Sequence, residues 1–301
     1  MTHLQDLQGR VAIVTGAGKG LGRAYALHLA SRGARVLVNN RRHPGEADSA
    51  TSAQQTVDAI RAAGGIAHTN YADVRDPDSG VNMVAQAYDV FGGLHIVVAN
   101  AGIDKAVGFH KQSLADFKDV FDVGFFGNLH LAHAAWPCLV KQKYGRVILT
   151  TSSAGLYGNH GQAAYSAAKA AVIGLMRALA IEGHRHGITV NAIAPYAYSQ
   201  MTAPYMNDDM ALAFESDRVA PLLGWLASEA CNISGDVLVS GAGWVRRAGV
   251  GETSAMALMN ESPGVTAHAL QDRPLQGYAC ANDSFAAFLQ EFAVPSTGGR
   301  Q

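Results

Sequence analysis

Cysteine is scarce in this sequence, and the few cysteines are not arranged for metal binding or cross-linking. Cys138, Cys231 and Cys280 lie far apart, and no CxxC motif occurs. Three dispersed thiols exclude a disulfide framework and do not fit a zinc site. They are therefore expected to be reduced, as in a cytoplasmic protein.

Runs of like charge and long apolar runs are also missing. The formal net charge is −1 and no Lys/Arg block exceeds two residues, which argues against a nucleic-acid partner or a polybasic membrane anchor. No apolar run approaches the roughly 20 residues of a membrane span. The N-terminal MTHLQDLQGR has no signal-peptide core, and the final GRQ is not a peroxisomal signal. These absences predict a cytoplasmic protein with no membrane or nucleic-acid partner.

Hydrophobic residues and glycine, by contrast, are plentiful. Hydrophobic residues make up 49% of the 301 residues, and 33 are glycine. Such a chain can bury a substantial core. Its length fits one large α/β domain, or a domain of about 250 residues with an appendage.

Short β-branched runs alternate with longer segments whose apolar residues recur at helical spacing. Alternation of this kind, with continuously apolar strands, is typical of a parallel sheet covered on both faces. The sequence therefore predicts a single doubly wound α/β sheet of the Rossmann type with about seven strands. The predicted strands are 11–15, 35–39, 66–71, 95–100, 146–151, 189–194 and 236–240.

The alternation ends near Gly243, and the tail has a different pattern. We predict a dinucleotide-binding and catalytic domain over 1–245 and a C-terminal helical extension over 246–301. Helices are predicted around 251–261, 264–271 and 283–292. The last has one apolar face, which predicts packing on the same domain or on a partner subunit: Phe285, Phe288, Leu289 and Phe292.

A glycine-rich turn follows the first predicted strand. It reads TGAGKGLG, with Gly16, Gly20 and Gly22 in TGxxxGxG spacing. Glycines let the backbone approach a pyrophosphate closely, and the N–H groups of the following helix point at it. Because the turn joins a strand to a helix in the first βα unit, it predicts a dinucleotide site rather than a simple tight turn.

Two further signals fall where predicted strands end. Asp73-Val74 follows the third strand, and Asn100-Ala101-Gly102 ends the fourth. Either could be an ordinary turn. Open α/β sheets bind ligands at the carboxyl ends of their strands, so both signals are assigned to the predicted nucleotide site.

The helix-forming run AAYSAAKAA carries a phenol and an ammonium group four residues apart, at Tyr165 and Lys169. Residues at this spacing are neighbours on a helix surface. A nearby cation favours the phenolate and can lower the pKa of a tyrosine by about 1–3 units, toward a range suited to acid–base catalysis. The plainer interpretation is a surface tyrosine beside a solvated lysine.

Together these segments resemble the short-chain dehydrogenase/reductase family. The resemblance rests on TGAGKGLG, the NAG at 100–102, Ser152 and Tyr165-Ser-Ala-Ala-Lys169, in matching order over about residues 8–245. From Tyr144 onward, TTSSAGLYGNHGQAAYSAAK, NAIAP and GAGW are similar to family domains that act on (3R)-hydroxyacyl-CoA esters and some steroids.

The resemblance implies an NAD(P)-dependent oxidoreductase that interconverts a secondary alcohol and a ketone in a bulky small-molecule substrate. Tyr165 would exchange a proton with the substrate oxygen, Ser152 would hydrogen-bond that oxygen, and Lys169 would tune Tyr165 and hold the nicotinamide ribose. The alternative is a catalytically silent sensor or scaffold that binds the dinucleotide. The resemblance further implies a homodimer or homotetramer, built partly on 113–141 and on one helix face: Ala164, Ala167, Ala168 and Ala171.

The predicted cofactor site joins the motif residues to those that the family resemblance adds. Its members are Gly16, Lys19, Gly20, Leu21, Gly22, Asn40, Arg41, Arg42, Asp73, Val74, Asn100, Ala101, Gly102, Tyr165, Lys169, Pro195 and Thr202. The candidates for the substrate pocket are Tyr157, Tyr196 and Tyr198. The last two could instead only pack under a lid segment over 196–216.

The residues after the second strand bear on the choice of cofactor. An acidic residue there commonly binds the adenosine ribose of NAD and repels the extra phosphate of NADP. This chain has Asn40 followed by Arg41 and Arg42, and Lys19 adds a cation. An amide does not repel a phosphate and a guanidinium can clamp one, so NADP(H) is favoured. The alternative is NAD(H), with Asn40 bonding the ribose and the arginines only solvated.

One family residue is missing. Many members have an Asn in the helix before the catalytic strand, where it organises a proton relay, and Gly124 occupies that position here. Asn128 could replace it only if the helix is distorted. Gly124 and Gly127 each cost up to ~1 kcal/mol in a helix interior, which makes a bend or close packing plausible.

Twelve histidines raise the question of a metal site. His130 and His133 could share a helix face, and His184 and His186 end a helix. Neither pair is accompanied by enough other ligands, so structural roles and no metal are predicted.

Overall fold

Eight strands form one sheet, in the order β3-β2-β1-β4-β5-β6-β7-β8, in the computed structural model of the chain. The structure describes residues 6–43, 45–47, 50–203, 206–254 and 273–291. This order is that of a doubly wound Rossmann fold, which confirms the predicted fold class. The strands are β1 Val11–Thr15, β2 Arg35–Asn39, β3 Ile66–Asn70, β4 Ile96–Ala99, β5 Gly145–Thr150, β6 Ile188–Tyr196, β7 Val237–Gly241 and β8 Trp244–Ala248.

Strands β1 to β7 pair in parallel, and their register brings their carboxyl ends to one edge. Thr15 of β1 lies beside Asn39 of β2, which lies beside Asn70 of β3. On the other side of β1, Thr150 of β5 lies beside Ile193 of β6. β1, β5 and β7 are buried at every residue, as expected for strands covered on both faces.

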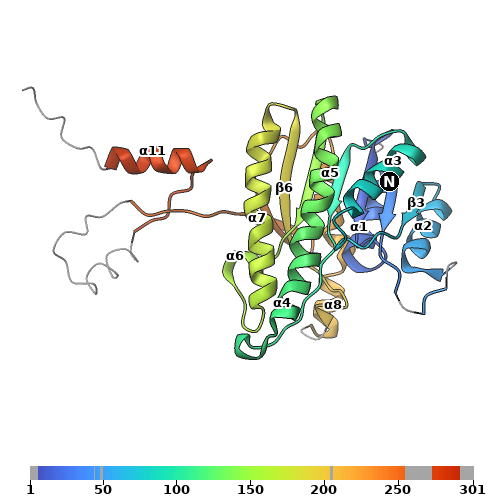
Figure 1. Cartoon of the computed structure of the whole chain (residues 1–301), viewed down its shortest axis with the longest axis horizontal. Helices are drawn as coiled ribbons and strands as arrows, with labels where there is room; N and C mark the ends of the chain where they lie inside the picture. Colours follow the sequence, from blue (N-terminus) through green and yellow to red (C-terminus); the bar gives the residue numbers. More distant parts are fainter. Residues whose placement is uncertain (1–5, 44, 48–49, 204–205, 255–272, 292–301) are drawn as a thin grey trace, which may run out of the picture. The chain divides into compact units, whose positions relative to one another are not determined.

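Helices cover both faces of the sheet, and α3, α5 and α7 can be followed across one of them in Figure 1. On the opposite face α1, α2 and α9 supply large side chains to the main core, among them Tyr25, Ile60 and Leu223. Among the described residues up to 247, the α-helices are α1 Gly20–Ser31, α2 Ser52–Ala62, α3 Ser79–Phe91, α4 Leu114–Phe121, α5 Gly127–Gln142, α6 Ser153–Tyr157, α7 Ala163–His184, α8 Asp208–Ala213 and α9 Ala220–Ala227. Short 3-10 helices lie at Phe109–Lys111 and Ser216–Arg218, and a π-helix lies at Asp122–Phe126.

Strand β8 is not predicted by the sequence. Ala242 and Gly243 have positive φ angles of 52° and 81°, and such a two-residue turn reverses the chain into a hairpin. Four of the five β8 residues are exposed. The strand therefore lacks the buried apolar run on which the other strand predictions rest.

Helix α7 has the length and composition of a membrane span, contrary to the expectation that no segment does. Length and composition do not distinguish such a span from the core helix of an α/β sheet. Here α7 packs on β6 and α6 and buries Val172, Ile173 and Met176. We assign it to the core.

The alanine face expected at a subunit interface is partly used inside the chain. Ala164 and Ala168 are fully buried, where they pack with Val120 of α4, so this part of the prediction is wrong. The physical reason is that α4 already covers that side of α7. The small residues that α7 leaves exposed are on another side and continue to Ile181: Ala170, Gly174 and Ala178.

The chain divides into two compact units, residues 1–247 and 248–301, whereas the predicted boundary at 245 falls inside β8. The second unit has an antiparallel bridge between Glu252 and Gln276 and the helix α11 (Ala281–Glu291). A helical extension is thus present. Phe285 on α11 is 63% exposed. The predicted helix at 264–271 lies outside the described residues, and the described part of 251–261 is not helical.

Candidate functional site

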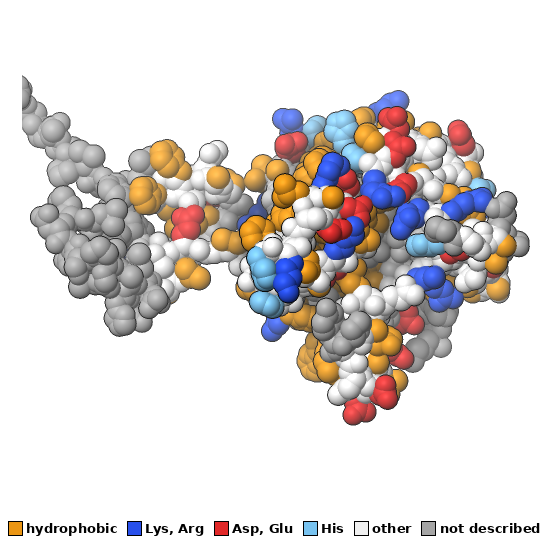
Figure 2. All heavy atoms as spheres, turned by 60° about the horizontal axis from the view of Figure 1, so that its bottom comes forward, with side chains coloured by type: hydrophobic (Ala, Val, Ile, Leu, Met, Phe, Trp, Pro, Cys, Tyr) orange, Lys and Arg blue, Asp and Glu red, His pale blue; other side chains and the backbone are white. Residues whose placement is uncertain are grey.

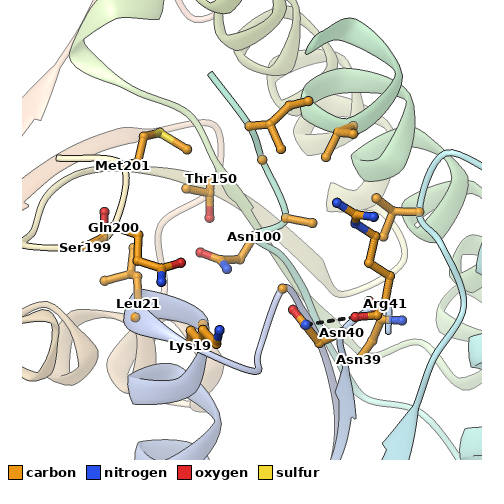
Figure 3. A pocket seen from close by; sticks show the side chains of 18 of the residues that line it. Lys19, Leu21, Asn39, Asn40, Arg41, Asn100, Thr150, Ser199, Gln200 and Met201 are labelled. Carbon is orange, nitrogen blue, oxygen red and sulfur yellow. Dashed lines mark hydrogen bonds between the residues drawn. The ribbon is translucent and has the colours of Figure 1, made fainter. Parts of the chain in front are cut away.

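A cavity of about 370 Å³ lies at the carboxyl ends of the strands. It is lined by every predicted cofactor residue except Arg42, and Ser152 lines it as well. In Figure 3, Lys19, Asn40 and Arg41 lie toward one end of the cavity, and Thr150 and Met201 lie toward the other. The fold therefore gathers residues from at least six strand ends at a single site.

The glycine turn is fixed to the neighbouring strand by Thr15. Its Oγ1 accepts hydrogen bonds from the backbone N–H groups of Asn100 and Ala101, at 2.9 and 3.1 Å. The Asn100 side chain returns a bond to the Thr15 carbonyl at 3.0 Å. Gly16 and Gly20 have positive φ, 64° and 51°, which side chains other than glycine rarely adopt. The turn is thus preorganised without side chains in the way of a ligand.

Gly22 has no room for any side chain. A Cβ atom there would lie 2.3 Å from the Gly16 carbonyl oxygen and 2.6 Å from Asn100 Nδ2. We expect Gly22→Ala to displace the turn and weaken dinucleotide binding by tenfold or more, since about 1.4 kcal/mol suffices for that factor. Calorimetric titration with the dinucleotide measures it.

Gly93→Ala is the matched control, because a Cβ there would make only an ordinary 3.5 Å contact with His95. Dinucleotide affinity in Gly22→Ala equal to that of the control would contradict the assignment of this turn to the cofactor.

The end of the cavity beside β2 carries mixed charges. Asn40 donates from Nδ2 to Ser52 Oγ at 2.9 Å, and Arg41 is exposed and lines the cavity. Arg42 does not line the cavity. Its guanidinium stacks on the Tyr71 ring at 4.5 Å, a cation–π contact that the sequence does not reveal.

Lys19 acts on a carboxylate near this end of the cavity. The pKa of Glu46 is lowered chiefly by a hydrogen bond from the His43 backbone, and the charge of Lys19 lowers it further. Lys19 therefore has a carboxylate in its surroundings.

Ion pairs continue along the rim from β3 to the loop after β4. Arg75 binds Asp73 at 2.5 Å and Asp119 at 3.4 Å, and Lys105 binds Asp116 and Asp119 at 2.7 and 2.8 Å. The hydrogen bonds from Arg75 hold the pKa of Asp73 below its usual range. The face drawn in Figure 2 shows this interspersion of basic and acidic side chains.

The inner end of the cavity holds the three predicted catalytic side chains. Ser152 lies two residues after the end of β5 and is the N-cap of α6, where its side chain accepts a hydrogen bond from the Ala154 N–H at 3.1 Å. Tyr165 and Lys169 lie one turn apart on α7, with Lys169 Nζ 5.8 Å from the centre of the Tyr165 ring. Lys169 is 2% exposed, and its Nζ donates to the Thr150 carbonyl at 2.8 Å. The structure thus brings the three together.

Burial reverses one expectation about this pair. It raises the pKa of Tyr165, the nearby Asp104 charge raises it further, and only the Ser152 hydroxyl lowers it. The net shift is therefore upward, opposite to the lowering that the sequence predicts from Lys169. Burial lowers the pKa of Lys169 to about 8. The phenol therefore stays protonated at neutral pH.

The glycines before α5 mark a distortion, as predicted. Residues Asp122–Phe126 form a π-helix with Gly124 buried in it. Asn128 donates from Nδ2 to the Gly124 carbonyl at 2.8 Å, while its buried Oδ1 has no hydrogen-bond partner. A π-turn disrupts the usual i to i+4 pattern, and the Asn128 amide satisfies the Gly124 carbonyl. Val123, within the π-helix, lines the cavity.

The three candidate substrate tyrosines do not line the cavity. Tyr157, Tyr196 and Tyr198 are 75%, 37% and 41% exposed, and Pro195, Ala197 and Ser199 between and beside the latter two line it instead. Sequence reasoning also missed several lining residues whose position at strand ends or beside NAIAP was a usable signal: Asn39, Ala72, Ile103, Thr150, Thr151, Ser199, Gln200 and Met201.

Two of the histidines considered for a metal site, His130 and His184, have structural positions. His130 Nδ1 lies 3.0 Å from the Val74 carbonyl, and the backbone of His184 ends α7. Within the described ranges, no three His, Cys, Asp or Glu side chains are grouped so as to hold a metal ion.

Comparison with known proteins gives matches along most of the chain. The sequence model of the family described as short chain dehydrogenase matches residues 10–210. Peroxisomal multifunctional enzyme type 2 of Mus musculus is 40% identical over 293 residues, which are 97% of this chain and 39% of the mouse enzyme. This chain thus spans well under half of that relative.

Two mycobacterial proteins match over most of their own length. A short-chain type dehydrogenase/reductase of Mycobacterium tuberculosis is 41% identical over 246 residues, 81% of this chain and 86% of that protein. The crystal structure of a short chain dehydrogenase from Mycobacterium avium superposes with a TM-score of 0.80 at 37% identity, covering 90% of this chain and 98% of that one.

Proposed function

This chain belongs to the short-chain dehydrogenase family and is an oxidoreductase, and from that premise we propose that it interconverts a secondary alcohol and a ketone at the cavity described above. The observation that carries the proposal is the convergence of Ser152, Tyr165 and Lys169 on the cavity that the glycine turn also lines. A buried phenol and a buried ammonium, without a carboxylate bonded to either, are costly unless they serve a site.

The residues present fit a nicotinamide dinucleotide. The glycine turn leaves no space for a Cβ at Gly22. The first residues of α1, Gly20, Leu21 and Gly22, line the cavity, so a helix N-terminus is placed where a pyrophosphate would bind. Asp73 and Val74 would flank the adenine, and Asn100, Pro195 and Thr202 would lie along the nicotinamide half. When bound, the nicotinamide supplies or takes up the hydride.

Tyr165 would move the proton. In reduction its phenol donates to the substrate oxygen, and in oxidation its phenolate accepts from the alcohol. Ser152 would hydrogen-bond the same oxygen and hold it near the phenol, because the Ser152 hydroxyl is close enough to act on Tyr165. General acid–base catalysis of this kind contributes about 10²–10⁴-fold to a rate.

Lys169 would supply the positive charge of the site. One of its N–H donors is taken by the Thr150 carbonyl, which leaves the others for a ribose hydroxyl or a water molecule. Gly102 lies beside it, since a Cβ there would be 3.4 Å from Nζ. This packing fixes the ammonium between the loop after β4 and the end of β5.

The substrate class follows from the family resemblance and from the relatives that are multifunctional peroxisomal enzymes. We propose a bulky hydroxy or keto substrate, a 3-hydroxyacyl-CoA ester or a hydroxysteroid. A panel of both, with their keto forms, assayed in both directions with both dinucleotides, tests this. Turnover confined to small alcohols, or none with any member, would contradict it.

The cofactor preference proposed for this chain is NADP(H). Arg41 is exposed at the cavity, Lys19 faces the same end, and Asn40 carries no charge that would repel a phosphate. A charge-assisted hydrogen bond from a guanidinium contributes about 1.5–3 kcal/mol, or roughly 10–100-fold in affinity. The carboxylate of Glu46 attracts Lys19 and so weakens the attraction of Lys19 for a phosphate. The preference for NADP(H) is therefore expected near the lower end of this range.

We expect wild type to show a kcat/KM for NADP(H) about tenfold or more above that for NAD(H). Asn40→Asp combined with Arg41→Ala should reverse the order. Arg42→Ala serves as the control, because Arg42 stacks on Tyr71 away from the cavity lining, and should leave the ratio unchanged. A wild-type preference for NAD, or an NADP preference that survives the double change, would contradict the proposal.

We also propose a homodimer or homotetramer that uses the exposed side of α7. Small residues at Ala170, Gly174 and Ala178 would let a second helix approach closely, with Ile181 at the end of the stripe. Light scattering that finds only monomers at micromolar concentration would exclude it.

A further inference from the structure

Two asparagines lie side by side at the ends of neighbouring strands. Asn39 ends β2 and Asn70 ends β3, and the two residues are paired in the sheet register. Their exposed fractions are 1% and 3%. A buried amide is costly unless its polar atoms are hydrogen-bonded, so the partners of these two side chains show what they hold in place.

Both side chains bind the backbone of Ala72. Asn70 Oδ1 accepts a hydrogen bond from the Ala72 N–H at 3.0 Å, and Asn39 Nδ2 donates to the Ala72 carbonyl at 2.9 Å. Asn39 Nδ2 also donates to Asn70 Oδ1 at 2.7 Å. The N–H and the C=O of Ala72 are therefore both held by side chains, one from each strand.

Helix α3 fixes the orientation of the Asn70 amide. Asn70 Nδ2 donates to Asn82 Oδ1 at 2.9 Å and to Gln86 Oε1 at 2.7 Å. Gln86 Nε2 in turn donates to the Thr69 carbonyl at 2.9 Å. Because both N–H donors of Asn70 are engaged by α3, its acceptor oxygen faces Ala72.

Ala72 begins a short segment that borders the cavity. Residues 72–74 line the cavity, as does Asn39 (Figure 3), whereas Asn70 is not among the lining residues. Further along the segment, Arg75 binds the Asp73 carboxylate. The asparagine pair thus holds the first residue of the segment from inside the fold.

We propose that Asn70, together with Asn39, positions the segment 72–74 for the adenine half of the dinucleotide. The inference rests on the proposed cofactor site. A segment that is already ordered loses little conformational freedom when the ligand binds, so its anchors raise affinity even without touching the ligand. The nicotinamide half lies along other strand ends, so loss of the anchor should weaken binding of the adenine half alone.

Asn70→Leu tests this, because leucine has a similar shape but no donor or acceptor. The affinity for ADP-ribose and for its 2′-phosphate, which lack the nicotinamide, should fall about five- to tenfold, since the apparent Kd rises as fewer molecules hold the binding conformation. The affinity for nicotinamide mononucleotide should stay within about twofold. Calorimetric titration, at a temperature where the variant is folded, measures both. In turnover, the KM for the dinucleotide should rise by the same factor as the fragment Kd, with kcat little changed.

Asn191→Leu is the matched control. Asn191 is a 1% exposed amide on β6 that donates to the Ile233 carbonyl and accepts from the Asp236 N–H, and it is not among the residues lining the cavity. Its loss should lower stability and leave both fragment affinities unchanged. Asn70→Asp keeps an acceptor oxygen for Ala72, so its affinity for ADP-ribose should stay within about twofold of wild type.

Equal affinity of Asn70→Leu and Asn191→Leu for the adenine fragments would overturn the inference, as would an equal loss for nicotinamide mononucleotide. If Asn70→Leu does not fold, Asn70→Ala replaces it under the same criteria, because alanine leaves room for water beside Asn82 and Gln86. Either contrary result would leave the proposed function standing. A wild type that binds neither dinucleotide would instead remove the proposed cofactor site, so the two failures are distinguishable.

Discussion

Replacing Tyr165 with phenylalanine is expected to lower kcat by about 10²–10⁴-fold, the usual contribution of a general acid or base. The change removes one hydroxyl group from a side chain that packs with Val120, Ala164 and Ala168. The ring and its contacts remain, so dinucleotide affinity should stay within about twofold of wild type, well under the 1.4 kcal/mol of a tenfold change. Steady-state kinetics and calorimetric titration of the dinucleotide measure the two effects separately.

Tyr88→Phe provides the matched control, because it removes a hydroxyl from an exposed ring on α3. It should leave both kcat and dinucleotide affinity unchanged. A Tyr165→Phe enzyme with a wild-type rate on an accepted substrate would show that another group moves the proton.

Replacing Lys169 with methionine is expected to lower turnover strongly and yet stabilise the fold. Methionine has nearly the length of lysine but no charge, so it can fill the space of a side chain that is 2% exposed. The lost positive charge should reduce kcat by 10²-fold or more and weaken dinucleotide binding. The lost desolvation cost should raise the free energy of unfolding near neutral pH.

The size of that stabilisation follows from the lysine pKa. Burial lowers the pKa of Lys169 from 10.5 to about 8. Between these values the unfolded chain binds more protons than the folded one, so wild-type stability rises with pH across that range. The full penalty acts below about pH 8 and corresponds to roughly 3 kcal/mol, less about 1 kcal/mol for the hydrogen bond that the Thr150 carbonyl loses.

Thermal or denaturant unfolding of both proteins from pH 7 to 10 measures this effect. The advantage of Lys169→Met should shrink as the pH rises. Lys141→Met, at an exposed position near the end of α5, should show neither the stabilisation nor its pH dependence. If Lys169→Met were less stable than wild type at pH 7, the buried ammonium would have to be compensated by a group that the structure does not place beside it.

Features encoded by contiguous residues could be predicted. The short β-branched runs predicted strands β1 to β7, and β1, β5 and β7 are buried on both faces of the sheet. Two motifs were predictable from their spacing, because backbone geometry alone brings their residues together. They are the glycine turn (Gly16, Gly20 and Gly22) and the pair Tyr165 and Lys169. Even the distortion before α5 was visible in Gly124 and Gly127.

Features that depend on distant residues or on exposed surfaces could not be predicted from the sequence. Strand β8 is exposed and charged, so it lacks the apolar pattern of a buried strand. Arg42 stacks on Tyr71, which lies 29 positions further along the chain. Ala164 and Ala168 are indistinguishable by sequence from the exposed Ala170 and Ala178. The side-chain hydrogen bond from Gln162 to Asp104 joins residues that are 58 positions apart, and no local sequence pattern links them.

Transfer of deuterium tests the central claim most directly. Wild-type protein is given a 3-ketoacyl-CoA ester and a ketosteroid, with each reduced dinucleotide carrying deuterium at the transferable position, and the products are examined by mass spectrometry and NMR. We predict one deuterium at the carbinol carbon of an accepted substrate, more rapidly from the NADP form, and a loss of this product by about 10²-fold or more with Tyr165→Phe. No deuterated alcohol from any substrate with wild type, or equal yields from wild type and Tyr165→Phe, would contradict the account.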